Sequence, residues 1–208
     1  MSKAIKITKG LDLKLYGEPT PEVVETFVSE YALKPKDFIG LTPKLLIEEG
    51  ERVKAGTPLF YAKGKEKVLF TSPVSGVVKQ VKRGEKRVIE EVIVSADETI
   101  EYLDFGVSSI SELNAEQIKE KMLISGAWTL LRQRPYSVVP NPDTTPKCII
   151  VSGFSSAPLA PDYSILLKGL GAELQVGIDA LKKMTGVTIH VNVPAGQGRA
   201  EELAKLNN

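Results

Sequence analysis

The sequence predicts two successive parts, an all-β domain and then an α/β domain. The chain has 208 residues, enough for one large or two small domains at roughly 150 residues each. Before residue 108 the apolar residues form short runs rich in Val, Ile and Phe, broken by glycine and proline, which is typical of strands. After it, apolar runs alternate with helical periodicity, as in a parallel α/β sheet. We therefore expect a β domain over residues 1–107 and an α/β domain over 108–208.

The first part is expected to hold short strands separated by tight turns. Glycine follows a polar residue at each expected turn: Glu49-Gly50, Lys63-Gly64, Ser75-Gly76 and Arg83-Gly84. The spacing of these turns suits a small barrel or sandwich. The expected strands are Ala4–Thr8, Val23–Ser29, Lys44–Ile47, Pro58–Ala62, Lys67–Thr71, Gly76–Lys82 and Arg87–Ser95.

A helix is expected within residues 108–135. Asn114 is a good N-cap, and Gln117 lies three residues later, as in a capping box. Ser125-Gly126 is expected to break this helix, and Pro135 to end the segment after the break. Residues 135–146 then contain four prolines within PYSVVPNPDTTP, which predicts an extended connector or loop.

The rest of the chain has the order strand, helix, strand, helix. KCIIVSG is typical of a buried parallel strand, and VTIHVNV is the next strand. A helix is expected from Asp162 to about Thr185, with Gly186 as its C-terminal stop, and another over 197–206. The first of these helices carries a stripe of apolar residues, namely Leu166, Leu170, Leu174, Ile178 and Leu181. Because two parallel strands make a poor domain, we expect a longer native protein and an α/β domain truncated at its C-terminus.

Charge and scarce residues exclude several classes of function. The net charge is +1, which argues against a nucleic-acid binder. One cysteine and one histidine exclude an internal disulfide, an iron–sulfur cluster held by this chain alone, and a zinc site of His and Cys only. We place no catalytic residue and no metal ligand. No run approaches about 20 apolar residues, and the N-terminus is no signal peptide, so we expect a reduced, cytoplasmic protein without a membrane span.

The strongest local pattern covers residues 45–87, LLIEEGERVKAGTPLFYAKGKEKVLFTSPVSGVVKQVKRGEKR. It resembles the barrel-sandwich hybrid fold of biotinyl and lipoyl carriers, in which glycine and proline set the turns of two hairpins. The tip of a true carrier presents a modified lysine in an Asp-Lys-Ala or Met-Lys-Met context. The tip here is AKGKEK, so we expect Lys65 and Lys67 to be unmodified, solvated lysines.

Two other segments leave alternatives open. In SGAWTLLRQRPYSVVP, residues 125–140, the arginines suit the C-terminal end of a helix dipole. Equally, these side chains could bind an anion or an aromatic ring, through Trp128, Arg132, Arg134 and Tyr136. The loop VSGFSSAPLAPD, residues 151–162, follows a strand, where open α/β sheets bind ligands. It is either an ordinary connection or a weak phosphate cradle, since it lacks GxGxxG and a P-loop lysine.

Taken together, the motifs resemble the A subunits of the bacterial sodium-translocating NADH:quinone oxidoreductases. The resemblance runs through nearly the whole chain, and RGEKR and SGxWTxLRxRPxSxxP are its most specific parts. It implies a peripheral subunit of a respiratory translocase, on the cytoplasmic face of the bacterial inner membrane. Such a translocase couples the transfer of electrons from NADH to ubiquinone with the export of sodium. The motifs that carry it are ITKGLDL, EEGERVKAGTPLF, FTSPVSGVV, RGEKRVIEEVIV, SGAWTLLRQRPYSVVP, APLAPD and LKKMTG with IHV.

The same resemblance carries expectations about cofactors and partners. The second domain is expected to be Rossmann-like and related to the C subunit of Rnf-type complexes and to the flavin subunit of respiratory complex I. In those relatives the segment matching SGAWTLLRQRP is a glycine-rich loop that holds FMN phosphate, whereas bulky residues replace the glycines here. We therefore expect no tightly bound cofactor, with quinone as substrate and with flavins and an iron–sulfur centre in partner subunits.

The resemblance also places the four candidate residues at the quinone end of the pathway. Trp128, Arg132, Arg134 and Tyr136 are then contacts for the quinone or for a facing subunit. Two other hypotheses remain: a non-catalytic carrier or scaffold module of a soluble multienzyme complex, and an independent flavoenzyme. The first, in its carrier form, requires a modified Lys65 or Lys67, and the second requires bound flavin.

Overall fold

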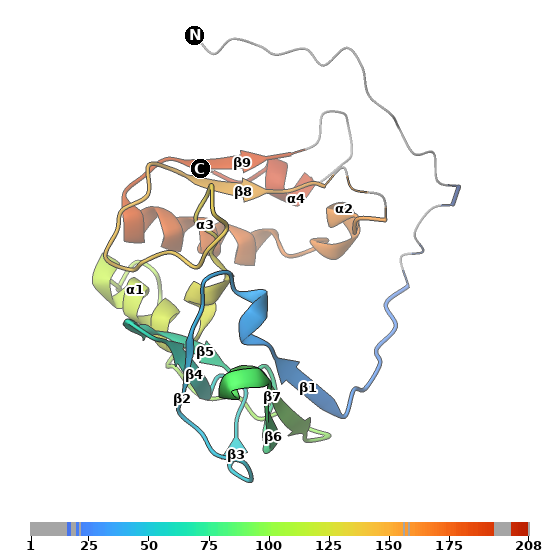
Figure 1. The fold of residues 1–208 in the computed structure, drawn as a ribbon. Coiled ribbons are helices and arrows are strands. Elements are labelled where there is room, and N and C mark those ends of the chain that lie inside the picture. The colour runs from blue at the N-terminus through green and yellow to red at the C-terminus, as the bar shows by residue number, and fades with distance from the viewer. Residues whose placement is uncertain are drawn as a thin grey trace, which may run out of the picture. The chain divides into compact units, whose positions relative to one another are not determined.

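The computed structural model describes residues 16–17, 20, 22–155, 157, 159–193 and 201–207. The chain divides into two compact units (Figure 1). The β-rich unit comprises Glu25–Cys148 and Asp179–Thr188. The α/β unit comprises the described residues within Met1–Val24, Ile149–Ile178 and Ile189–Asn208.

Two antiparallel sheets form the β-rich unit. One has the strand order β1-β7-β6-β3 and the other β2-β4-β5. Side chains from both sheets belong to one buried cluster, so the core lies between them. The strands are β1 (Glu30–Leu33), β2 (Pro43–Leu45), β3 (Arg52–Val53), β4 (Pro58–Ala62), β5 (Lys65–Thr71), β6 (Gly76–Arg83) and β7 (Ile89–Ala96).

Aromatic rings fill the centre of this core. Phe60 and Phe70 are stacked with their ring centroids 5.0 Å apart, and Phe38 meets Phe70 edge-on at 4.7 Å. Val68 and Phe70 on β5 are buried at alternate positions, as the period of a strand requires. Each such fully buried side chain stabilises the fold by about 1.5–3 kcal/mol.

The expected strands from residue 43 onward are confirmed to within three residues at each end. β4 has the expected bounds, whereas β5 begins at Lys65 rather than Lys67 and β7 begins at Ile89 rather than Arg87. Of the expected Lys44–Ile47, only the first part is strand, because β2 ends at Leu45. β3 pairs with β6 through only two residues and was not expected.

The expected strand Val23–Ser29 is wrong. No regular element covers it, and Phe27 is 63% exposed. The strand begins at Glu30 instead, where the backbone pairs with β7 in the register Glu30↔Ser95. An apolar run forms a strand only where a partner strand is present. β7 pairs with the chain only from Glu30 onward, so the strand begins after the residues that the composition indicates. The expected strand Ala4–Thr8 lies outside the described residues.

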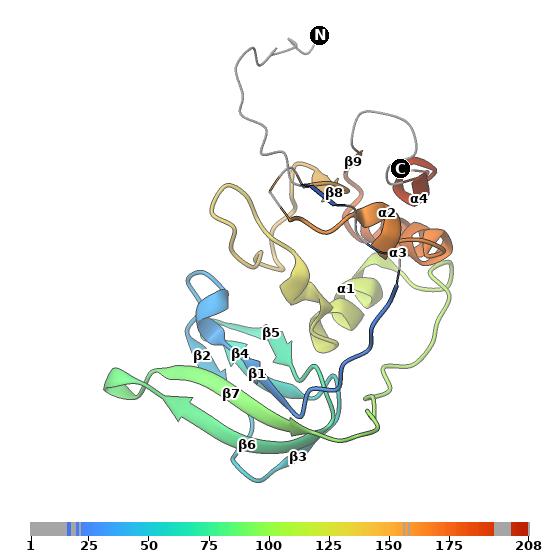
Figure 2. The same ribbon diagram turned by 90° about the vertical axis from the view of Figure 1, so that its right-hand side faces the viewer.

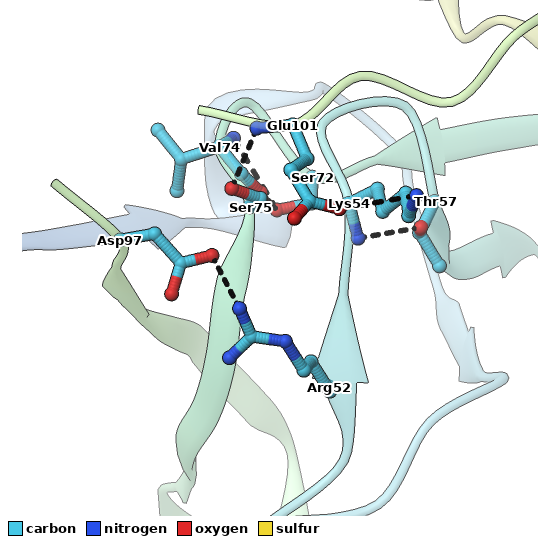
Figure 3. Close-up of polar contacts among 8 residues, drawn as sticks. All are labelled: Arg52, Lys54, Thr57, Ser72, Val74, Ser75, Asp97 and Glu101. Atoms are coloured by element: carbon cyan, nitrogen blue, oxygen red, sulfur yellow. Dashed lines mark hydrogen bonds and ion pairs between the residues drawn. The ribbon is translucent and has the colours of Figure 1, made fainter. Parts of the chain in front are cut away.

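Small residues close the turn between β5 and β6 (Figure 3). The Ser72 hydroxyl donates to the Val74 carbonyl oxygen at 2.7 Å, and the Ser75 hydroxyl accepts from the Glu101 N–H at 2.9 Å. Both serines are almost fully buried. Gly76 has φ +153°, and a Cβ there would lie 1.8 Å from the Ser95 carbonyl oxygen. The Ser-Pro-Val-Ser-Gly motif therefore lets β6 approach β7 closely.

The expected capping box is present. Helix α1 covers Ala115–Ile124, the Asn114 side chain accepts from the Gln117 N–H at 2.9 Å, and the Gln117 side chain accepts from the Asn114 N–H at 2.9 Å. The helix ends before Gly126, which has φ +79°, and the 3₁₀ helix η3 follows over Ala127–Leu130. Residues 135–146 form a loop without a regular element, as expected.

Two lysines hold the connector before α1 by its backbone. The Lys121 ammonium donates to the carbonyl oxygens of Phe105 and Gly106 at 2.7 and 2.9 Å. The Lys183 ammonium donates to those of Ile110 and Ser111 at 2.8 and 3.0 Å. By its spatial contacts, the β-rich unit thus continues past residues 107 and 108. The expected division of the chain into two domains at that point stays a prediction.

The α/β unit contains the expected parallel pair. β8 (Ile149–Ser152) and β9 (Ile189–Asn192) run parallel in the register Ile150↔His190. β8 is not fully buried as expected, since Ile150 is 62% exposed. The helices of the described residues after β8 are α2 (Tyr163–Leu166), α3 (Gly171–Thr185) and α4 (Glu201–Ala204).

The single helix expected from Asp162 to Thr185 is wrong. It divides into α2 and α3 because Gly169 takes φ +80° between them. The end at Gly186 is confirmed, with φ +67° and its N–H donating to the Lys182 carbonyl oxygen at 2.8 Å. Of the helix expected over 197–206, residues 197–200 lie outside the described residues, and α4 ends at Ala204.

Gly76→Ala should destabilise the protein more than Gly64→Ala. Both glycines have positive φ, but a Cβ at Gly64 meets nothing within 4 Å, whereas one at Gly76 collides with backbone. We expect a loss of about 1–2 kcal/mol for Gly64→Ala from left-handed strain alone, and about 3 kcal/mol or more for Gly76→Ala. Urea unfolding of both variants measures the difference, and equal losses would contradict the close approach of β6 to β7.

Candidate functional site

The candidate segment, residues 125–140, is anchored on β5. The Thr71 hydroxyl donates to the Ser125 carbonyl oxygen at 3.3 Å. At the next residue, Gly126, a Cβ would lie 2.3 Å from the Thr71 hydroxyl oxygen. Glycine is therefore needed at this position both for its positive φ and for its close approach to the strand.

Trp128 belongs to the core rather than to the surface. Its side chain is only 5% exposed, and its indole N–H donates to the Pro140 carbonyl oxygen at 3.0 Å. The neighbouring Thr129 is also buried, and its hydroxyl donates to the Gly126 carbonyl oxygen at 2.7 Å. These contacts fix the start and the end of the loop that the segment forms.

Arg132 is bound by its own turn and by an aromatic ring. Its guanidinium donates to the Leu131 carbonyl oxygen at 3.0 Å and to the Thr129 carbonyl oxygen. The guanidinium carbon also lies 5.4 Å from the centroid of the Phe38 ring, within the range of a cation–π contact. One nitrogen of the planar donor fork of this arginine, Nη1, is thus engaged within the protein.

Arg134 and Tyr136 lie on an exposed turn. The Gln133 N–H donates to the Val138 carbonyl oxygen at 2.7 Å and closes this turn, which we call the 133–138 turn. Tyr136 is 73% exposed, and Arg134 is also exposed, with no ion pair to another described residue. The structure therefore brings Arg132, Arg134 and Tyr136 onto one surface segment and leaves Trp128 beneath it.

Two contacts at this segment were not expected from the sequence. Lys65, at the start of β5, has its ammonium 3.5 Å from the Val139 carbonyl oxygen and is half-buried. Lys67 is exposed. No local pattern links residue 65 to residue 139, so sequence reasoning had no signal for this contact, nor for the contact of Phe38 with Arg132.

A separate groove lies on the β-rich unit. It has a volume of about 860 Å³ and is lined by residues Leu45, Leu46, Ile47, Glu48, Glu49, Glu51, Val81 and Arg83. The Glu49 carboxylate accepts from the Val81 N–H at 2.7 Å, so one wall of the groove is fastened to β6. None of the four residues expected from the sequence lines it.

The strand-to-helix loop at residues 151–162 contains a glycine that packing requires. A Cβ at Gly153 would lie 2.4 Å from a Leu203 side-chain carbon and 2.7 Å from the Asn192 carbonyl oxygen. The glycine thus serves the contact of β8 with β9 and α4. The phosphate cradle stays a prediction, since Ser156 and Pro158 lie outside the described residues.

Neither a metal cluster nor a membrane helix occurs in the described ranges. Within these ranges, no three of the His, Cys, Asp and Glu side chains are grouped as metal ligands would be. No helix there combines the length and the apolar character needed to cross a bilayer.

Comparison with known proteins decides the family. The model of the NqrA N-terminal barrel-sandwich hybrid domain matches residues 5–97, and that of the NqrA second alpha/beta domain matches residues 113–208. The chain belongs to the NqrA family. The barrel-sandwich hybrid fold and the α/β domain expected from the sequence are thereby confirmed.

Curated relatives agree with this assignment. A protein of Serratia proteamaculans, named as the A subunit of a Na(+)-translocating NADH-quinone reductase, is 37% identical over 197 residues, which cover 92% of this chain. A protein of the same name from Yersinia pseudotuberculosis is 36% identical over 196 residues, or 93% of this chain. The chain spans about 44% of the length of each relative.

Trp128→Phe should destabilise the fold, whereas Tyr136→Phe should not. The first change removes an N–H bonded to Pro140 and leaves a void among buried residues, so we expect a loss of about 1–3 kcal/mol. The second alters an exposed side chain and should stay within about 0.5 kcal/mol. Thermal and urea unfolding measure both variants, and equal stabilities would contradict the burial of Trp128.

Proposed function

We propose that this chain supplies the first two domains of the A subunit in a sodium-translocating NADH:quinone reductase. The observation that carries the proposal is the match of both NqrA domains, in order, over nearly the whole chain. The names of the curated relatives support it. In this proposal the subunit is peripheral, lies on the cytoplasmic face of the bacterial inner membrane, and acts at the quinone end of the complex.

We further propose that the flavins and the iron–sulfur centre belong to partner subunits. The segment that would have to cradle a flavin phosphate is a 3₁₀ helix with Trp128 and Thr129 buried. A phosphate cradle needs exposed backbone N–H groups and little side-chain bulk. In the described ranges, the only cysteine is Cys148, which cannot hold a cluster alone.

The 133–138 turn is the best candidate for a contact with the quinone or with a facing subunit. Arg134 offers a planar donor fork and Tyr136 an amphipathic ring, and both are exposed. Arg132 and Trp128 support the turn from within, through the Thr129 and Pro140 carbonyl oxygens. The proposed contact therefore rests on two of the four residues expected from the sequence.

Co-purification from native membranes tests the assignment to the complex. Affinity-tagged full-length subunit should bring down the membrane subunits, and sodium-dependent quinone reductase activity should follow them through the purification. The 208-residue chain, purified alone, should show no flavin absorbance. Recovery of the full-length subunit without membrane proteins, or with a soluble multienzyme complex, would contradict the proposal.

Arg134→Lys and Arg132→Lys should have different effects. In the full-length subunit, Arg134→Lys should leave the melting temperature unchanged but lower quinone reduction or assembly, by roughly tenfold if a bidentate contact is lost. Arg132→Lys loses contacts with two carbonyl oxygens and with Phe38, and should cost about 0.5–1 kcal/mol of stability. Unchanged turnover of the Arg134 variant in the assembled complex would remove the 133–138 turn from the function.

A further inference from the structure

The Arg-Gly-Glu-Lys-Arg motif forms the tip of the β6–β7 hairpin. Figure 2 shows this hairpin as a long arm of the β-rich unit, with the turn at its end. Between Arg83 and Val88 every side chain is exposed. The function proposed above uses none of these residues. We call residues 83–88 the basic tip.

The backbone of the basic tip is strained. The Val88 N–H donates to the Glu85 carbonyl oxygen at 3.1 Å and closes a four-residue turn. Its two central residues, Lys86 and Arg87, have φ +54° and +60°. A turn with positive φ at both central positions matches the twist of a hairpin, and Asn-Gly is the preferred pair for it. L-residues with long side chains rarely adopt this conformation.

The exposed side chains of Lys86 and Arg87 make no hydrogen bond or ion pair with another described residue. The glycine of the motif, Gly84, precedes the turn and has φ -93°, so it does not occupy either of the positions with positive φ. At the two positions where positive φ favours glycine or asparagine, the chain carries Lys86 and Arg87 instead. Non-glycine residues with such strained backbone cluster at functional sites.

The side chains of the basic tip offer positive charge around an apolar residue. It holds three cations, Arg83, Lys86 and Arg87, and one acid, Glu85. Neither Lys86 nor Arg87 forms an ion pair with another described residue. Val88 beside them is 58% exposed. The guanidinium of Arg83 reaches the Arg87 carbonyl oxygen at 3.4 Å and further braces the turn.

We propose that the basic tip is a docking element for an acidic, partly apolar pocket on another protein. Its partner is one of the other subunits, a choice that rests on the function proposed above. Lipid headgroups are attracted by the number of charges, typically about 4–8 clustered lysines or arginines, and the tip has fewer. A fixed turn conformation, by contrast, gives a shaped pocket a preorganised ligand with little ordering entropy left to lose.

The double substitution Lys86→Asn with Arg87→Gly tests the proposal. It installs the residues that this turn prefers, so it keeps the backbone and removes both cationic side chains. In the 208-residue chain it should raise the melting temperature by about 2–4 °C. In the full-length subunit it should weaken co-purification with the other subunits roughly tenfold, and rising ionic strength should weaken the unmodified subunit's association in the same way.

A matched control removes two charges from the other hairpin of the same unit. Lys63→Asn with Lys67→Asn changes two exposed lysines near the β4–β5 turn and should leave assembly unchanged. Normal assembly of the double variant at residues 86 and 87 would overturn the docking role, as would its loss of binding to phosphatidylserine vesicles with assembly intact. If the unmodified subunit does not associate with the others at all, the proposed function fails first, and the partner named here fails with it.

Discussion

The close approach of Gly126 to Thr71 is the contact on which the candidate site depends. Because the chain at residue 126 lies against β5, the helix before it must end there. The following turn then directs Trp128 into the core, where its indole N–H finds the Pro140 carbonyl oxygen. Both ends of the loop are thus held by contacts with the β-rich unit, and residues 132–136 between them are exposed.

The aromatic core extends this constraint to the surface. Phe60 stacks on Phe70, Phe70 meets Phe38, and Phe38 lies beneath the guanidinium of Arg132. A cation at the edge of the site is thus positioned by rings that belong to the centre of the sheets. Substitutions in the core can therefore alter the 133–138 turn without touching it, since packed interiors transmit strain.

Features that depend on neighbouring residues could be predicted from the sequence, and features that depend on distant ones could not. The capping box at Asn114 and the strand Pro58–Ala62 arise from local chemistry, and both are present. The strand expected at Val23–Ser29 required knowledge of its partner, β7. For the site, the motif identified the right segment, but the burial of Trp128 and the pairing of Arg132 with Phe38 depend on tertiary packing.

The hydrogen bonds from Lys121 and Lys183 to the connector, residues 105–111, determine which sequence changes the connector tolerates. Lys121 and Lys183 bind carbonyl oxygens at residues 105–106 and 110–111, and every amino acid presents such an oxygen. The identities of the connector residues are therefore weakly constrained by these contacts, whereas their number is strongly constrained, because the oxygens must fall at fixed places. Except at Gly106, whose φ of +73° favours glycine, a substitution keeps the oxygens that the two lysines bind, whereas an insertion or deletion between them displaces these oxygens.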